Sequence, residues 1–141
     1  MLKKTLLTLI LGLGLSSSLY AGTQLKEDMQ KLSATMAEAQ FGFFTNNKAI
    51  SLSAITRLKK ETSEVLGNKE TITALLPDEV KYKASIAINS ADMISRYSKE
   101  IEDTLNNKNM KAITKEMKAQ KAFIEIQNQC FRCHNLVRDW Q

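Results

Sequence analysis

Apolar residues recur along most of the chain at alternating steps of three and four, which is the spacing of one buried face of an α-helix. The first series consists of Leu25, Met29, Leu32, Met36, Ala39 and Phe43. Asn46 and Asn47 follow it, and Asn tolerates the turn conformations that end helices. The pattern predicts a first helix over about 24–45.

A second apolar series predicts a helix over about 48–66. Gly67-Asn68 follows and is expected to form the C-cap, because Gly and Asn readily adopt the conformations found there. The stretch 67–76 is then the longest predicted loop. Its apolar residues are expected to fold over the rest of the molecule: Ile72, Leu75 and Leu76.

Two more helices complete the pattern. The third is expected to begin at Pro77-Asp78-Glu79, where Asp78 can cap free backbone N–H groups, and to continue to about residue 105. The fourth covers about 110–138. Four amphipathic helices with mostly short connections favour an all-α fold, an up-down-up-down four-helix bundle.

Three small residues lie on the inward face of the third predicted helix: Ala84, Ala87 and Ala91. They would fill a bundle interior poorly if side chains of the size of Leu were needed there. Either a large group occupies the space beside them, or they bring the third and fourth helices closer together. The apolar pattern leaves both interpretations open.

Composition agrees with this fold and narrows the function. The chain has 141 residues, 43% of them hydrophobic, and its five Gly and one Pro provide few turn-formers for a β-rich fold. Its net charge of +5 comes from basic residues that are scattered over several segments. This distribution is typical of a solvated surface, and we expect no nucleic-acid partner.

The first 21 residues have the features of a secretory signal peptide. A positive start with Lys3 and Lys4 precedes an apolar stretch over 5–15, and the segment ends in the small residue Ala21. The apolar stretch is shorter than the roughly 20 residues that span a bilayer, which argues against a membrane anchor. We expect cleavage after Ala21 and a single exported domain over 22–141, located in the periplasm.

A Cys-x-x-Cys-His motif near the end of the chain comprises Cys130, Cys133 and His134. In an exported protein, two such cysteines could form a disulfide, half of a zinc site or a thioredoxin-type redox pair. A disulfide here would close a very small loop and stabilise little. Zinc needs four ligands, but the chain offers two Cys and one His. A thioredoxin-type pair belongs to a fold with strands, which the apolar pattern does not predict.

Covalent attachment of haem c would use all three residues of the motif. Both thiols add to the haem vinyl groups, and the imidazole of His134 coordinates the iron as the proximal ligand. On a helix, Cys130, Cys133 and His134 stand at i, i+3 and i+4 and project from one face. That face joins the apolar seam of the fourth helix. The sequence therefore predicts one covalently bound haem that faces the bundle interior.

This motif at the end of a predicted four-helix bundle resembles the class II c-type cytochromes, the family of cytochrome c prime and its low-spin relatives. The resemblance covers the mature chain in architecture but only the C-terminus in motif, from Cys130 to Arg138. It implies that Arg138, four positions after His134, lies near the haem edge. The preceding residue is commonly aromatic in the family and is Val137 here. The resemblance also allows a homodimer paired through the first two helices.

The sixth coordination position of the iron determines what such a haem does. His134 is the only His, so the choices are Met, Lys, water or a vacant site. In an up-down-up-down bundle, the start of the first helix lies beside the end of the fourth. Met29 is near that start, whereas Met36 is about 10 Å further along at roughly 1.5 Å per residue. The resemblance implies the same ligand, because low-spin members carry an axial Met early in the first helix.

With His134 and Met29 as metal ligands, the expected function is electron transfer. The protein would be a monohaem carrier that exchanges single electrons with periplasmic redox proteins, and the axial Met would raise the haem potential. No catalytic residue is then required, and we do not expect an enzyme. The alternative is a five-coordinate haem that binds nitric oxide or carbon monoxide as a scavenger or sensor.

Overall fold

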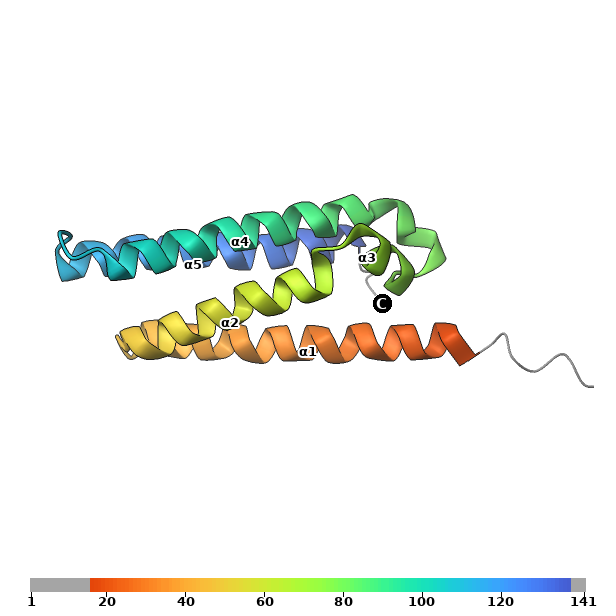
Figure 1. The fold of residues 1–141 in the computed structure, drawn as a ribbon, viewed down its shortest axis with the longest axis horizontal. Coiled ribbons are helices and arrows are strands. Elements are labelled where there is room, and N and C mark those ends of the chain that lie inside the picture. Colours follow the sequence, from red (N-terminus) through yellow and green to blue (C-terminus); the bar gives the residue numbers. More distant parts are fainter. Residues whose placement is uncertain (1–15, 138–141) are drawn as a thin grey trace, which may run out of the picture.

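The computed structural model describes residues 16–137, and all regular elements in this range are helices (Figure 1). They are α1 (Ser16–Phe44), α2 (Lys48–Leu66), α3 (Lys69–Leu75), the 3-10 helix η1 (Asp78–Lys83), α4 (Ala84–Asn106) and α5 (Ala112–Val137). The predicted all-α class is confirmed, and the arrangement is compatible with a helical bundle. Most of the predicted signal peptide and the predicted site residue Arg138 lie outside the described residues.

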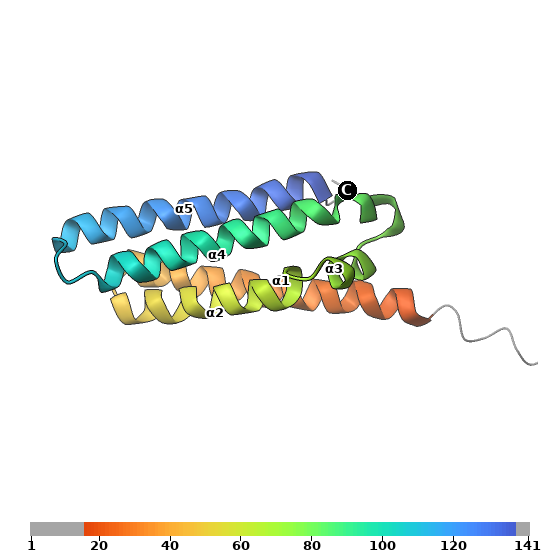
Figure 2. The same cartoon turned by 45° about the horizontal axis from the view of Figure 1, so that its top comes forward.

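The four long helices form two antiparallel pairs (Figures 1 and 2). α1 packs along α2, and α4 packs along α5. α2 also packs on α4 and joins the two pairs, whereas α1 and α5 make no comparable contact. α3 and η1 lie at the end of the molecule where α1 begins and α5 ends. The start of α1 and the last turns of α5 are therefore at the same end.

α2 has its predicted bounds, because the residues expected at its two ends act as its caps. At its start, the side chain of Asn47 accepts a hydrogen bond of 3.1 Å from the backbone N–H of Ile50. At its end, the N–H of Gly67 donates to the carbonyl oxygen of Ser63 over 3.0 Å. Asn46 turns the chain between α1 and α2 with a φ of 52°, a left-handed conformation that Asn tolerates. The prediction of this helix and of the turn before it is confirmed.

α1 begins at Ser16 rather than at about residue 24. Gly22 is the weakest helix former in the added segment, and its cost relative to Ala is only about 1 kcal/mol. The predicted start followed the first residues that can pack, Leu25 and Met29, and both do pack against buried residues. The expected cleavage position after Ala21 falls within this helix and stays a prediction.

The stretch predicted as the longest loop contains a helix. Asn68 caps the N-terminus of α3, because its side chain accepts a hydrogen bond of 2.9 Å from the N–H of Thr71. Ile72 and Leu76 are buried. The loop prediction is therefore wrong, since Asn68 begins a new helix instead of only ending α2. The expectation that apolar residues of this stretch fold over the rest of the molecule is confirmed.

The third predicted helix is divided into η1 and α4. Pro77 precedes the 3-10 helix, and the α-helix begins only at Ala84. The N-cap position of η1 is Pro77, without a side-chain capping hydrogen bond, so the prediction that Asp78 caps this helix is wrong. The carboxylate of Asp78 pairs instead with Lys81 over 2.5 Å. This ion pair within η1 holds the pKa of Asp78 below its ordinary value, mainly through the hydrogen bond from Lys81.

The ends of α4 and α5 agree with the prediction to within one residue, at Asn106 and Val137. The three small residues of α4 are buried and face inward as predicted: Ala84, Ala87 and Ala91.

Within residues 16–137, buried apolar side chains form two clusters, one that extends from the middle of the molecule toward the turn between α1 and α2 and one at the α3 end. The first, which we call the mid-bundle core, consists of Ala39, Phe43, Ala54, Ile55, Leu58, Ile94, Ile101, Leu105, Ala119, Ala122, Phe123 and Ile126. The second, the end core, consists of Leu66, Ile72, Leu76, Val80, Ala84, Ala87 and Ala91. Since Ile72 and Leu76 come from α3 and its C-cap, apolar side chains of this segment occupy the space beside the small residues of α4.

Candidate functional site

The Cys-x-x-Cys-His motif lies on the last turns of α5, at the end of the molecule that carries α3 and η1 (Figure 1). Both cysteines are half-buried. Cys130 packs against the mid-bundle core, and Cys133 packs against the end core. The two cysteines therefore lie at the junction of the two cores.

His134 is exposed, in contrast to the prediction that all three motif residues face the bundle interior. Successive helical positions differ by about 100°, so the residues at i+3 and i+4 lie on opposite sides of residue i, roughly 60° and 40° away. The cores cover Cys130 and the side of α5 toward Cys133. His134 is on the other side. A group bound to the imidazole of His134 would therefore lie at the edge of the buried core and not within it.

Burial raises the pKa of both motif thiols above the ordinary cysteine value. The loss of solvent around the thiolate is the main cause at each position, and the neighbouring Cys133 thiolate adds a repulsion at Cys130. Both thiols are therefore protonated at neutral pH. This environment disfavours a thioredoxin-type pair, whose attacking cysteine needs a lowered pKa.

Met29 lies at the same end core as Cys133. It packs half-buried against this core from α1, whereas Cys133 does so from α5. Met36, two turns further along α1, packs against the mid-bundle core instead. The position of Met29 at the motif end agrees with the sequence-based expectation. Its ligation of a metal stays a prediction.

Arg138 lies beyond the last described residue, so its place near the motif also stays a prediction. Lys83 is a basic residue that the structure does place at this end. Its Nζ atom lies 5.6 Å from the ring centre of Tyr82, which is exposed. Both residues belong to η1. This end of the molecule therefore combines the motif with a cation and an aromatic ring.

The chemistry of the motif fits a covalently bound haem. Two thiols and one imidazole within five residues supply the two thioether links and the nitrogen ligand that haem c requires. Gln129 directly precedes the motif, and its buried Oε1 atom has no hydrogen-bond partner among residues 16–137. A buried acceptor without a donor is costly, so the structure is compatible with a further group beside the motif.

The arrangement of the helices limits where such a group could lie. Side chains from α3 and its C-cap already occupy the space beside the small residues of α4. α1 and α5 make little contact with each other, although Met29 and Cys133 reach the same core from these two helices. A flat group between α1 and α5 would therefore leave the close helix pairs intact.

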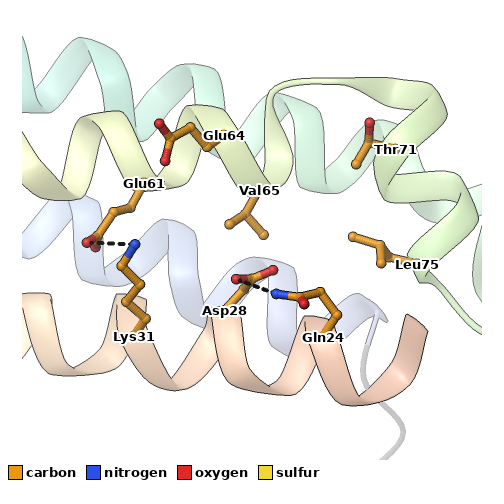
Figure 3. Close-up of a pocket in the computed structure, with 8 residues that line it drawn as sticks. All are labelled: Gln24, Asp28, Lys31, Glu61, Glu64, Val65, Thr71 and Leu75. Carbon is orange, nitrogen blue, oxygen red and sulfur yellow. Dashed lines mark hydrogen bonds and ion pairs between the residues drawn. The ribbon is translucent and has the colours of Figure 1, made fainter. Parts of the chain in front are cut away.

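A cavity of about 280 Å³ opens between α1, α2 and α3 (Figure 3), and we call it the polar cavity because most of its lining residues are polar or charged. Its lining comprises Gln24, Asp28, Lys31, Glu61, Glu64, Val65, Thr71 and Leu75. Gln24 donates a hydrogen bond of 3.1 Å to Asp28, and Lys31 pairs with Glu61 over 3.5 Å. The sequence-based prediction missed this cavity, because its lining comes from three separate segments and one of them was predicted as a loop.

Within residues 16–137, no group of three or more His, Cys, Asp or Glu side chains is arranged to hold a metal ion. None of the described helices combines the length and the apolar character needed to cross a membrane.

Comparison of the chain with protein-family models, with curated proteins and with solved structures finds no match. The function is therefore inferred from the residues and their arrangement alone.

Proposed function

We propose that this chain is an exported monohaem c-type cytochrome, an up-down-up-down four-helix bundle that carries single electrons between redox proteins of the periplasm. The main support is the position of Met29 relative to the C-terminal motif. Met29 and Cys133 pack against the same end core from two different helices. A sulfur ligand and the motif imidazole would thus be available at one end of the bundle.

Each site residue has a distinct role in this proposal. Cys130 and Cys133 would hold the haem through thioether links, and His134 and Met29 would be its axial ligands. A bound haem of this type supplies reversible one-electron exchange, at a potential that an axial Met raises. Arg138 would lie near the haem edge, as it does in the cytochromes that the chain resembles.

The half-buried position of the motif supports electron transfer. Both cysteines pack on apolar cores, which would shield one part of the haem from water. His134 is exposed, so another part of the haem would lie near the surface. Solvent exposure and hydrogen bonding are two of the means by which a protein sets the potential of such a cofactor. An exposed edge would also bring the haem within reach of a partner protein.

The mass of the exported chain tests haem attachment. The chain is expressed with a haem-attachment system, and we expect the polypeptide 22–141 plus one haem. The pyridine haemochrome spectrum should be that of a haem with both vinyl groups consumed. The matched control is the double variant Cys130→Ala/Cys133→Ala, which keeps His134 and should be exported without covalent haem. A wild-type mass equal to the bare polypeptide would exclude the proposal.

Optical spectra then distinguish an electron carrier from a gas-binding protein. An electron carrier with two axial ligands should be low-spin, should be reduced and reoxidised reversibly, and should bind carbon monoxide poorly in its ferrous form. A high-spin spectrum with rapid carbon monoxide binding would favour the five-coordinate alternative instead.

A further inference from the structure

The outer face of α5 carries an aligned set of exposed apolar side chains. Among the described residues, five of the eight exposed large hydrophobics belong to α5. Four of these, between 53% and 65% exposed, are Ile113, Met117, Ile124 and Phe131. We call them the α5 stripe. At about 100° and 1.5 Å per residue, they fall within an arc of about 40° and extend over about 27 Å. Single exposed apolar residues are ordinary, but an aligned set of this length indicates an interaction surface.

We propose that the α5 stripe is the contact surface of a homodimer, in which α5 of a second copy packs antiparallel against it. A two-fold axis at Ile124 pairs three of the four stripe residues with one another, whereas Ile113 lies opposite the exposed Asn135 of the second copy. Ile124 then meets Ile124 of the second copy, and Met117 meets Phe131, because these two positions are equally distant from Ile124. A thioether against an aromatic ring is a favourable contact. The proposal does not depend on haem, so its test is separate from that of the proposed function.

The polar residues beside the stripe support the antiparallel orientation. A two-fold axis of this kind brings the same flank of each helix together. Lys121 and Glu125 of the second copy are then only about 3 Å apart along the direction of the helix axis. The two-fold symmetry creates this ion pair twice. On the other flank, Gln120 faces Gln127 of the second copy, and the two side-chain amides can both donate and accept hydrogen bonds. In a parallel pair, Lys121 would face this amide flank and would lack its acidic partner.

The size of the stripe fits a weak dimer. Its four side chains expose roughly 500 Å² in each copy, so two copies would bury roughly 1,000 Å², which is near the lower limit for a specific interface. We therefore expect a reversible dimer with a Kd on the order of 10–100 µM.

The structure also favours α5 over the first two helices as the dimer surface. The resemblance allows pairing through α1 and α2. Among the described side chains of these two helices, the exposed large hydrophobics are Phe41 and Phe44, near the C-terminus of α1. The stripe on α5 is longer and lies on one face.

Sedimentation equilibrium of the full exported chain, over about 5–500 µM, tests the dimer. We expect Ile124→Lys to weaken it at least about tenfold, because the substitution places a charge at the centre of the contact. Phe44→Lys is the matched control, since it changes an even more exposed residue on α1 and should leave the Kd unchanged. Circular dichroism should show the same helix content for all variants.

Charge reversal tests the orientation. Lys121→Glu and Glu125→Lys should each weaken the dimer about three- to tenfold, and the double variant should restore the wild-type Kd to within about twofold. A chain that stays monomeric to the highest concentration overturns the proposal. A dimer that Phe44→Lys weakens and Ile124→Lys does not also overturns it. Flotation with phosphatidylglycerol vesicles tests a membrane as the alternative partner. If the chain is monomeric, binds these vesicles and loses this binding in Ile124→Lys, the stripe is a lipid-binding surface and the dimer proposal is overturned.

Discussion

Thr35 on α1 donates a hydrogen bond of 2.8 Å from its Oγ1 atom to Oε2 of Glu61 on α2, and each residue is only 4% exposed. The other carboxylate oxygen of Glu61 lies 3.5 Å from Nζ of Lys31 and 4.0 Å from Nε of Arg57. Removing a carboxylate from water costs several kcal/mol, so a buried one is tolerated only with such partners. The interaction therefore fixes α1 against α2 beside the polar cavity (Figure 3).

Replacing Thr35 with Val keeps the shape of the side chain and removes the donor. We expect the free energy of unfolding to fall by about 1.5–3 kcal/mol, because the hydrogen bond is made to a charged group. Thr35→Ser keeps the hydroxyl and should cost no more than about 1 kcal/mol. Urea denaturation measures both values. Equal losses in the two variants would show that packing, and not the hydrogen bond, is important at this position.

Gly42 lies at a close approach of α1 to α2. A Cβ atom at this position would be 2.6 Å from the backbone N and 3.0 Å from the Cα of Ser51. Gly42→Ala gains about 1 kcal/mol of helix propensity, but an overlap with backbone atoms costs about 1–3 kcal/mol. We therefore expect a net loss of stability in thermal or urea melts. The control Gln40→Ala, at an exposed position of the same helix, should stay within about 0.5 kcal/mol of wild type.

Asn68 holds the start of α3 through its side chain. Asn68→Ala should cost about 1 kcal/mol, because the N–H of Thr71 loses its acceptor. Hydrogen exchange should become faster in Lys69–Leu75 and remain unchanged in α2. Asn68→Asp is the control, since it keeps an acceptor oxygen and suits the positive end of the helix. Faster exchange throughout the chain would mean that α3 is not a separate unit of local unfolding.

Met29 decides the ligation state of the proposed haem. In the haem-loaded chain, Met29→Ala should open the sixth position, so that the ferrous form binds carbon monoxide while the covalent haem mass is unchanged. Met36→Ala is the matched control on the same helix and should remain low-spin, although it creates a cavity at the mid-bundle core. Identical spectra for wild type and Met29→Ala would exclude Met29 as a ligand.

The raised pKa values of Cys130 and Cys133 make the stability of the haem-free chain dependent on pH. Folding favours the protonated thiols, so their contribution is complete below the pKa of unfolded cysteine, about 8.5, and is lost as the pH rises toward the folded pKa. Urea melts should therefore show a decreasing free energy of unfolding from about pH 8 to 9.5. Cys130→Ala/Cys133→Ala should remove this decrease. An equal decrease without the thiols would assign it to other groups.

The long helices could be predicted because their apolar series are long and their ends carry turn-forming residues. α2 has its predicted bounds, and both Asn47 and Gly67 act at its ends as expected. α3 could not be predicted in this way, because seven residues are too few to show a helical period. Asn68 also has two interpretations, since it can follow one helix and cap the next.

The candidate site was predictable where it depends on local spacing and on the order and direction of the helices. The motif lies on the last helix, and Met29 lies at the same end, as expected. The exposure of His134 was not predictable, because it depends on which side of α5 the end core covers. The same holds for the polar cavity, whose lining residues become neighbours only after α1, α2 and α3 have packed.

Cys130 and Cys133 are one helical turn apart, yet they pack on different cores. A ring bonded to both sulfur atoms would therefore contact the middle of the molecule and its α3 end at once. Both covalent links lie on one helix and constrain little by themselves, but apolar surface buried against each core would raise the free-energy cost of local opening at the α3 end.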